Sequence, residues 1–195
     1  MTAVDRYSPN SLGRMLGRVN STVFKDDKGE VEYFGNRVLI IRKNVFRRLE
    51  EEMLKRHSVG TGRIILTILG RSEGHEEGRT LMKDVLLDAA DRRSLPVFVK
   101  NALEESNLGY GKLKLGDWDV SSKTVTVSTQ NSVESDATNK SSDNGCFFLL
   151  GYLEGLFAEL LNSPLIASET SCRGRGDDAC VFQINPAPPP SKIRL

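Results

Sequence analysis

The segment 146–161 constrains the fold of this chain more than any other feature. Its residues are apolar almost all the way around a helix, with Glu154 and Glu159 as the charged exceptions. A helix that is apolar on every side must be covered on every side, so the pattern predicts a central buried helix. Gly151 and Gly155 lie on one face of it, where a second backbone can come close. The segment is too short and too charged to span a bilayer.

Composition fits a folded globular chain around such a helix. Hydrophobic residues make up 38% and charged residues 27% of the sequence, and the net charge is +1. This balance argues against a disordered chain and against the basic footprint of a nucleic-acid binder. Residues 1–18 contain no apolar stretch that could form the core of a signal peptide, so we expect a cytoplasmic protein.

Three regions are predicted along the chain: an N-terminal arm (1–36), a ligand-binding domain (37–185) and a disordered proline-rich tail (186–195). Short β-prone runs flank a glycine-terminated turn at 26–29, which predicts a β-hairpin in the arm. Asn44 is expected to cap a helix that ends near His57. The residues expected on the apolar face of this helix are Val45, Phe46, Leu49, Met53 and Leu54, with Glu50 among the charged residues outside.

Further elements follow from periodicity and from turn residues. Helices are predicted at 61–69 and 81–90, and the glycines between them, Gly70, Gly74 and Gly78, either break the helix or let another backbone approach. Another helix follows Ser94 and closes at Gly109. The remaining predicted elements are paired strands at 112–120 and 124–129, a flexible loop at 134–145, and a terminal hairpin of strands at 165–170 and 179–184.

Three cysteines and one glutamate form a candidate metal site. Cys172 and Cys180 stand at the two ends of the loop in the terminal hairpin, so pairing of the strands can bring their sulfurs together. Glu169 lies just before Cys172. Cys146 stands at the first turn of the central helix, where the helix dipole is expected to lower the pKa of its thiol. Three thiolates and one carboxylate suit a tetrahedral zinc ion.

The spacing of these residues leaves two alternatives open. Free cysteines are often small buried hydrophobes, and no pair of cysteines shows the two-residue spacing of common structural zinc sites. A redox-active thiol pair is the second alternative, although the spacing is not that of disulfide oxidoreductases. The count of 3 cysteines is odd, and without an export signal it favours reduced thiols over disulfide bridges.

The hairpin 169–182, with the sequence ETSCRGRGDDACVF, resembles the signature of the 4-vinyl reductase (4VR) domain family. Ahead of it, Asn131, Ser132, Cys146 and the run 151–155 stand in the order that the family shows. The resemblance is weak from about Arg37 onward and strong over 109–184. The family includes the sensor domains of transcription activators that respond to phenol and other aromatic compounds.

The resemblance implies both a metal site and a fold. In the family, zinc is held by one cysteine at the start of a helix and by a Glu-x-x-Cys-x7-Cys hairpin, which here implies Cys146, Glu169, Cys172 and Cys180 as ligands of a structural zinc ion. The implied fold is α/β (α+β), with an antiparallel sheet of about four strands packed with helices. It is shared with nitric-oxide-signalling and Golgi-transport domains. The order of strands and helices predicted above agrees with it.

The resemblance also implies a small apolar ligand, enclosed between the sheet and the helices. The sequence has no phosphate-binding Gly-x4-Gly-Lys-Ser/Thr loop, so we expect a stand-alone sensor or carrier whose output passes through a separate regulatory protein or a dimer surface. Val133 stands where the phenol sensors have a tryptophan. His57 and His75, the latter in a predicted glycine-rich turn, are expected in solvent, so a phenolic ligand is not favoured. Trp118 is expected to pack in the core with its indole N–H bonded to backbone or water, and the less favoured alternative is that it lines a ligand pocket.

Two other functions compete with ligand binding. One is a structural, protein-interaction module of the Golgi-tethering type. The other is a vinyl-group reductase, which the family's name suggests but for which the sequence offers no Gly-x-Gly-x-x-G motif linked to a strand and helix. The sequence therefore argues against an enzyme more than for one, and it identifies no catalytic residue.

The N-terminal region is expected to mediate assembly. Short strands with unpaired amides tend to be paired or covered, and the sensor relatives dimerise through their N-terminal portions. We therefore predict a homodimer whose interface uses Val23, Phe24, Tyr33, Phe34 and part of the helix 44–57. The alternative is that the hairpin folds onto its own domain.

Overall fold

The computed structural model of the chain describes residues 22–25, 30–33, 36–39, 42–88, 95–105, 109–135 and 145–189. The helices are α2 (Lys43–Arg56), α3 (Val59–Asp88), α4 (Leu95–Glu105) and α5 (Phe147–Leu160). The strands are β1 (Thr22–Lys25), β2 (Glu30–Tyr33), β3 (Asn36–Val38), β4 (Leu113–Asp119), β5 (Thr124–Thr129), β6 (Leu165–Ser171) and β7 (Cys180–Pro186). A 3-10 turn, η3 (Arg173–Arg175), lies between β6 and β7.

The main sheet is antiparallel, with four strands in the order β4-β5-β7-β6. Alternate residues of its central strands point to one face and are almost fully buried, as in the pairs Val125–Ile184 and Val127–Phe182. A period of two residues along each strand produces this one-sided burial. Helix α5 covers that face, with contacts to both β6 and β7. The predicted α+β fold with a four-stranded antiparallel sheet is confirmed.

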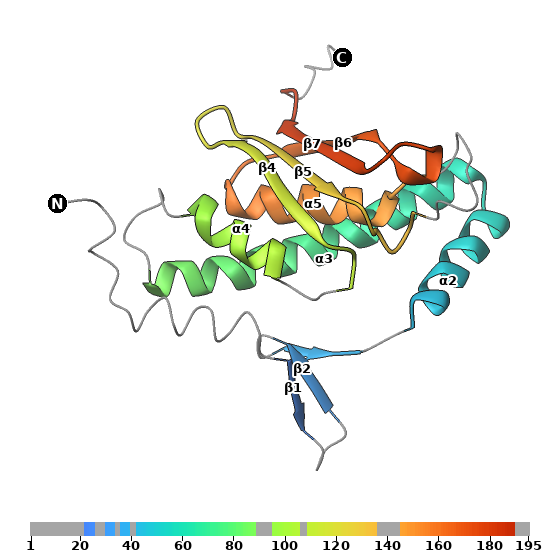
Figure 1. Ribbon diagram of the computed structural model, residues 1–195, viewed down its shortest axis with the longest axis horizontal. Helices are drawn as coiled ribbons and strands as arrows, with labels where there is room; N and C mark the ends of the chain where they lie inside the picture. Colours follow the sequence, from blue (N-terminus) through green and yellow to red (C-terminus); the bar gives the residue numbers. More distant parts are fainter. Residues whose placement is uncertain are drawn as a thin grey trace, which may run out of the picture.

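Helix α5 is the centre of the molecule, as its apolar pattern predicts. It lies between the main sheet on one side and the long helix α3 on the other (Figure 1). Leu149, Leu153, Leu156 and Phe157 are each 0% exposed. Because both sides of α5 meet another layer, its sequence needs no polar face.

Helix α3 runs without a break through its glycines, which resolves the alternative that the sequence leaves open. A Cβ atom added at Gly74 would lie 2.0 Å from the carbonyl oxygen of Tyr152, and one added at Gly151 would lie 2.0 Å from that of Thr67. The glycines therefore let the backbones of α3 and α5 touch. His75 lies within α3 and not in a turn as predicted.

Two buried or half-buried acids of α5 tie the three layers together. Glu154 is 8% exposed, accepts the Ala167 N–H of β6 at 3.0 Å, and pairs with Arg71 of α3 at 2.6 Å. Glu159 lies 2.9 Å from the His75 ring nitrogen Nδ1. His75 is therefore half-buried against a carboxylate, contrary to the prediction of a solvated side chain.

Helix α2 differs from its prediction in two respects. It begins at Lys43 with Arg42 as the N-cap residue and no side-chain cap, so Asn44 is inside the helix. Val45 and Leu49, expected to face the core, are 51% and 54% exposed, whereas Glu50, expected outside, is 8% exposed. The helix turns the face with Glu50 toward the domain, because the side chain of Glu134 lies there as a hydrogen-bond partner.

Strands β1, β2 and β3 form a second antiparallel sheet. The predicted N-terminal hairpin is thus paired with a third strand, in a region where residues 37–41 are also β-prone. Phe34, Ser94 and most of the predicted loop 134–145 lie outside the described residues, as does the tail from 190. Of the helices in the described ranges, none combines the length and the apolar character needed to cross a membrane.

Candidate metal centre

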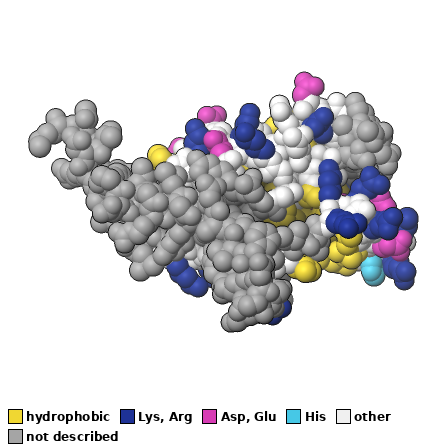
Figure 2. All heavy atoms as spheres, turned by 60° about the horizontal axis from the view of Figure 1, so that its bottom comes forward, with side chains coloured by type: hydrophobic (Ala, Val, Ile, Leu, Met, Phe, Trp, Pro, Cys, Tyr) yellow, Lys and Arg dark blue, Asp and Glu magenta, His cyan; other side chains and the backbone are white. Residues whose placement is uncertain are grey.

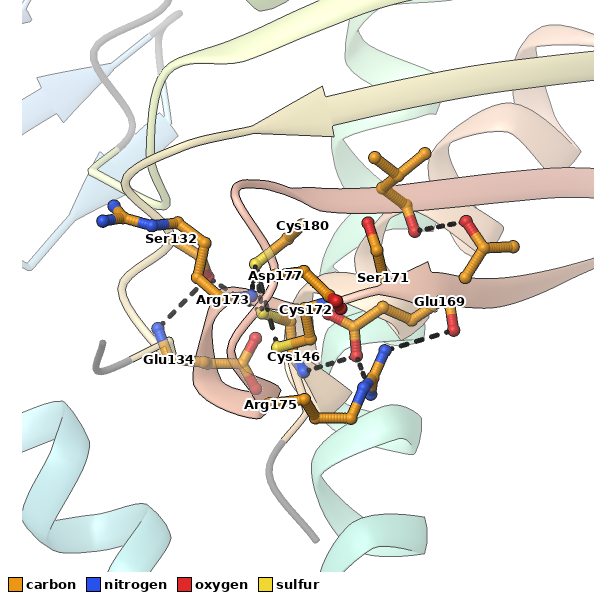
Figure 3. Close-up of polar contacts among 12 residues, drawn as sticks. Ser132, Glu134, Cys146, Glu169, Ser171, Cys172, Arg173, Arg175, Asp177 and Cys180 are labelled. Carbon is orange, nitrogen blue, oxygen red and sulfur yellow. Dashed lines mark hydrogen bonds and ion pairs between the residues drawn. The ribbon is translucent and has the colours of Figure 1, made fainter. Parts of the chain in front are cut away.

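The four predicted metal ligands come together at one end of the face between the main sheet and α5. Cys146 is the N-cap residue of α5, and Cys180 is the first residue of β7. Glu169 lies on β6, and Cys172 follows that strand directly. Figure 3 shows the three sulfur atoms turned toward one another, with the Glu169 side chain beside them.

The distances in this cluster suit coordination of one ion. One ligand atom from each residue can be chosen so that all four lie within 4.8 Å of one another. The Cys146 sulfur is 3.6 Å from that of Cys180, which is 3.8 Å from that of Cys172. A tetrahedral zinc site with Zn–S bonds of about 2.3 Å has sulfur–sulfur edges of about 3.8 Å, whereas a disulfide requires about 2.05 Å. The three thiols are free, and each residue is 0% exposed.

The loop between β6 and β7 is folded so that its backbone surrounds the sulfur atoms. The Cys172 N–H donates to the Asp177 carboxylate at 2.7 Å, and the N–H of Arg173 points at the Cys180 sulfur at 3.4 Å. Gly176 turns the chain with a φ of 111°, which a residue with a side chain rarely adopts. Glycine and aspartate in this loop therefore bring Cys172 back beside Cys180.

The Glu169 carboxylate is held by one oxygen and open at the other. Its Oε2 accepts the Cys146 N–H at 3.2 Å and pairs with the Arg175 guanidinium at 3.1 Å. Its Oε1 is buried and has no hydrogen-bond partner among the described residues. Burial raises the pKa of this carboxyl group. An unpaired buried carboxylate oxygen beside three sulfurs is the environment that a cation would complete.

The pKa values of the thiols in this cluster shift in opposite directions. Hydrogen bonds with Cys146 and then Cys172 lower the pKa of Cys180 to about 2. The pKa of Cys146 is raised, first by its hydrogen bonds with Cys172 and Cys180 and then by burial. The predicted lowering of the Cys146 pKa by the helix dipole is therefore wrong for the metal-free cluster, because two neighbouring sulfurs outweigh the dipole.

The sequence of this hairpin, of α5 and of the strand before it resembles a known domain family. Residues 125–186 match the V4R domain. The match covers β5, α5, β6 and β7, and thus the whole candidate metal centre, and it confirms the resemblance to the 4-vinyl reductase family. A short segment of 39 residues is also 38% identical to an uncharacterized protein of Methanocaldococcus jannaschii, and that segment spans 22% of the relative's length.

Solved structures extend the likeness beyond the V4R domain. The phenol-responsive sensory domain of the transcription activator PoxR has a TM-score of 0.72 at 13% identity, with 92% of each chain covered. A subunit of the trafficking protein particle complex from Naegleria fowleri has a TM-score of 0.54 at 11% identity, covering 75% of this chain and 93% of that one. A vinyl-4-reductase family protein from Methanocaldococcus jannaschii scores 0.49 at 12% identity. At these identities the first two likenesses establish the fold alone.

The structure adds residues around the three cysteines that sequence reasoning did not assign. Ser132 is 0% exposed, and its hydroxyl oxygen lies 3.3 Å from the Cys146 sulfur. The Arg173 guanidinium donates to the Gln130 carbonyl oxygen and to the Asn131 side chain, which ties the hairpin loop to the segment with Ser132. The Asn-Ser pair was part of the family's order, which is the one signal that pointed to this segment.

Glu134 was predicted to begin a flexible loop, and that prediction is wrong for this residue. Its two carboxylate oxygens accept the N–H groups of Phe148 and Leu149, each at 2.7 Å. The carboxylate thus satisfies two free amides at the start of α5, next to Cys146. Sequence reasoning missed this cap because Glu134 lies outside the turn where local capping residues are sought.

Proposed function

We propose that this chain is a zinc-stabilised module that binds a small, largely apolar molecule and acts as a sensor or carrier. The observation that carries the zinc proposal is the convergence of four ligand atoms. The Glu169 Oε1 atom in this cluster has no hydrogen-bond partner among the described residues. Cys146, Glu169, Cys172 and Cys180 would hold the ion. Zinc, when bound, would neutralise the thiolates and cross-link the start of α5 to the hairpin of β6 and β7.

Four protein ligands would leave no open position for a substrate, so we assign the ion a structural role. Arg175 supports this role, because its positive charge offsets the negative charge that three thiolates and a carboxylate would carry in excess of a divalent ion. Ser132 would donate its hydroxyl proton to the Cys146 thiolate. Such outer hydrogen bonds orient metal ligands in proteins.

The ligand-binding part of the proposal is supported by the fold likeness to a sensory domain over nearly the whole chain. PoxR's sensory domain binds phenol in the solved structure. For this chain we propose a small molecule that is mostly apolar, because the side chains between α5 and the sheet are aromatic and aliphatic. We propose no phenol specificity.

We further propose that the chain forms a homodimer and passes its signal to a separate regulatory protein. Val45 and Leu49 on α2 and Ile64 and Ile68 on α3 leave apolar side chains at the surface. The face that Figure 2 turns forward shows hydrophobic side chains gathered beside Lys and Arg side chains. Three free thiols are suited to a reducing compartment, and a cytoplasmic location remains our prediction.

A structural interaction module is the second candidate. It is favoured by the fold likeness to the trafficking complex subunit, a protein that was solved with palmitic acid covalently attached. An interaction module would bind partner proteins through its surfaces and would need no small-molecule ligand. We favour a reductase least, since the sequence lacks the dinucleotide-binding motif, and the purified protein should not consume reduced nicotinamide with a tetrapyrrole substrate.

Native mass spectrometry of protein purified without added metal tests the proposal directly. We expect one zinc ion per chain, a retained small molecule or a site that accepts one, and a dimer mass. A metal-free preparation that is fully folded would refute the zinc part. A zinc-loaded protein that never retains or accepts a small molecule would favour the interaction module.

A further inference from the structure

Trp118 is the only tryptophan of the sequence, and its buried N–H group has no partner among the described residues. Trp118 lies on β4, just after an irregularity in the register with β5, and pairs with Val125. Its ring meets the edge of the Phe157 ring of α5, with centroids 5.3 Å apart and planes at 84°. The side chain therefore points into the layer between the sheet and the central helix. Its Nε1 atom is buried, and no acceptor contacts it in the part of the chain that the structure describes.

An unpaired indole N–H needs an explanation. Leaving a buried donor unsatisfied costs about 1–3 kcal/mol, and buried tryptophans usually find a hydrogen-bond partner. Sequence reasoning expected a backbone or water partner for Trp118, and the described backbone supplies none. A phenylalanine would make the edge contact with Phe157 without this cost. The indole nitrogen is thus a donor placed where the described residues supply no acceptor.

The position of Trp118 separates it from the metal centre. Trp118 pairs with Val125 at one end of β5, whereas Thr129 at the other end pairs with Cys180. At about 3.3 Å per residue, the two ends of this strand are roughly 13 Å apart. The unpaired N–H therefore cannot be a partner for the cysteine cluster. Its surroundings are the apolar side chains of the core, including Phe157 and Val125.

We propose that Trp118 is the polar anchor of a binding site for a small apolar molecule that carries one hydrogen-bond-accepting oxygen, such as an aryl ketone. The indole N–H is a donor only, so the ligand must present the acceptor. The apolar side chains around the indole favour a ligand whose remaining part is apolar, and they disfavour a permanently charged one. This inference rests on the proposed ligand-binding function and names the group that recognises the ligand.

Two probes of nearly equal shape test the anchor: acetophenone, which has a carbonyl oxygen, and α-methylstyrene, which has a methylene group in its place. Because the chain contains 1 tryptophan, its nitrogen–proton NMR spectrum contains one indole signal, which needs no assignment. Acetophenone should move this signal downfield in a saturable way, and α-methylstyrene should not. By calorimetry, acetophenone should bind roughly 3- to 10-fold more tightly, which is the value of one net hydrogen bond.

The variant Trp118→Phe keeps the aromatic edge and removes the donor. In this variant acetophenone should bind no more tightly than α-methylstyrene. Its zinc content should match that of the wild-type protein, and without ligand its melting temperature should be equal or higher, because the unpaired donor is gone. The wild-type NMR titration requires no variant, so the inference stays testable if Trp118→Phe folds poorly. Acetophenone binding without movement of the indole signal would overturn the anchor but leave ligand binding intact. Failure of both probes to bind at 5 mM would overturn the anchor and its ligand class, while native mass spectrometry would still decide the broader function.

Discussion

Glu50 of α2 forms a side-chain hydrogen bond to Glu134, the residue that caps the start of α5. Two carboxyl groups can form this bond only if one of them carries a proton. Burial, the largest cause, raises the pKa of Glu50 to about 7, and burial followed by the charge of Glu50 raises the pKa of Glu134 well above its usual value. The pair therefore joins α2 to the helix that presents Cys146.

This shared proton predicts a pH-dependent stability. A carboxyl pKa that is higher in the folded state makes the folded protein bind more protons, so its contribution is complete below about pH 4.5 and is lost as the pH rises through about 7. Glu50→Gln keeps a donor without titrating, and its stability relative to wild type should rise by on the order of 2 kcal/mol between pH 5 and 8. Urea unfolding at several pH values measures this difference. Glu52→Gln, at an exposed position on the same helix, should leave the wild-type profile unchanged.

Loss of a metal ligand should destabilise the protein strongly. Cys172→Ala or Cys180→Ala should abolish stoichiometric zinc and lower the free energy of unfolding by about 4 kcal/mol or more, because the remaining ligands would be buried anions without a cation. Glu169→Gln keeps an oxygen atom that can coordinate the ion, so it should lower the free energy of unfolding less. Elemental analysis and thermal unfolding measure both quantities, with Asp178→Asn in the exposed part of the same loop as control.

The role of Cys146 can be checked by thiol labelling of the same preparations. In the zinc-loaded protein all three thiols should resist iodoacetamide, and a chelator should make them reactive. Rapid alkylation of Cys146 before metal removal would show that it is not a ligand. That result would favour the redox alternative for the cysteines.

The close contact of α3 and α5 predicts which glycines tolerate a methyl group. Gly151→Ala places a Cβ atom 2.0 Å from the Thr67 carbonyl oxygen, and Gly74→Ala meets the Tyr152 carbonyl oxygen at the same distance. Separation of the two backbones should cost about 3 kcal/mol or more. Gly60→Ala is the matched control, since its nearest atom would be 4.0 Å away, and it should be neutral or stabilising by up to about 1 kcal/mol. Equal effects of all three changes in thermal unfolding would contradict the contact.

The proposed homodimer predicts a concentration-dependent mass in solution. Light scattering at tens of micromolar should give twice the chain mass of 21.6 kDa for the full chain. Leu49→Glu, on the exposed apolar side of α2, should weaken the dimer, whereas Ile166→Glu, which is 50% exposed on β6, should not. A chain that begins at Arg37 should become monomeric if β1 and β2 contribute. A monomeric full-length protein would refute the dimer, and a dimeric truncated chain would locate the interface elsewhere.

Local sequence determined the central elements of this protein. The residues of 147–160 are apolar around the whole helix, so the helix had to be buried on all sides. This requirement does not depend on which parts of the chain form the layers that cover it. The alternation in β5 predicted that Val125 and Val127 face the core, which the structure confirms. The cluster of Cys146 with the hairpin cysteines was not fixed by spacing, which left alternatives open; the resemblance to a known family selected it.

Tertiary structure decided which polar groups meet. Glu50 is buried although its helix pattern places it outside, because its partner Glu134 comes from a distant segment. The glycines of α3 could break a helix or admit a neighbour, and only the contact with α5 selects the second outcome. Cys146 has a raised thiol pKa because the sulfurs of Cys172 and Cys180, from the hairpin of β6 and β7, lie beside it. Periodicity fixes the direction in which a side chain points, but burial and protonation depend on what the rest of the chain places opposite it.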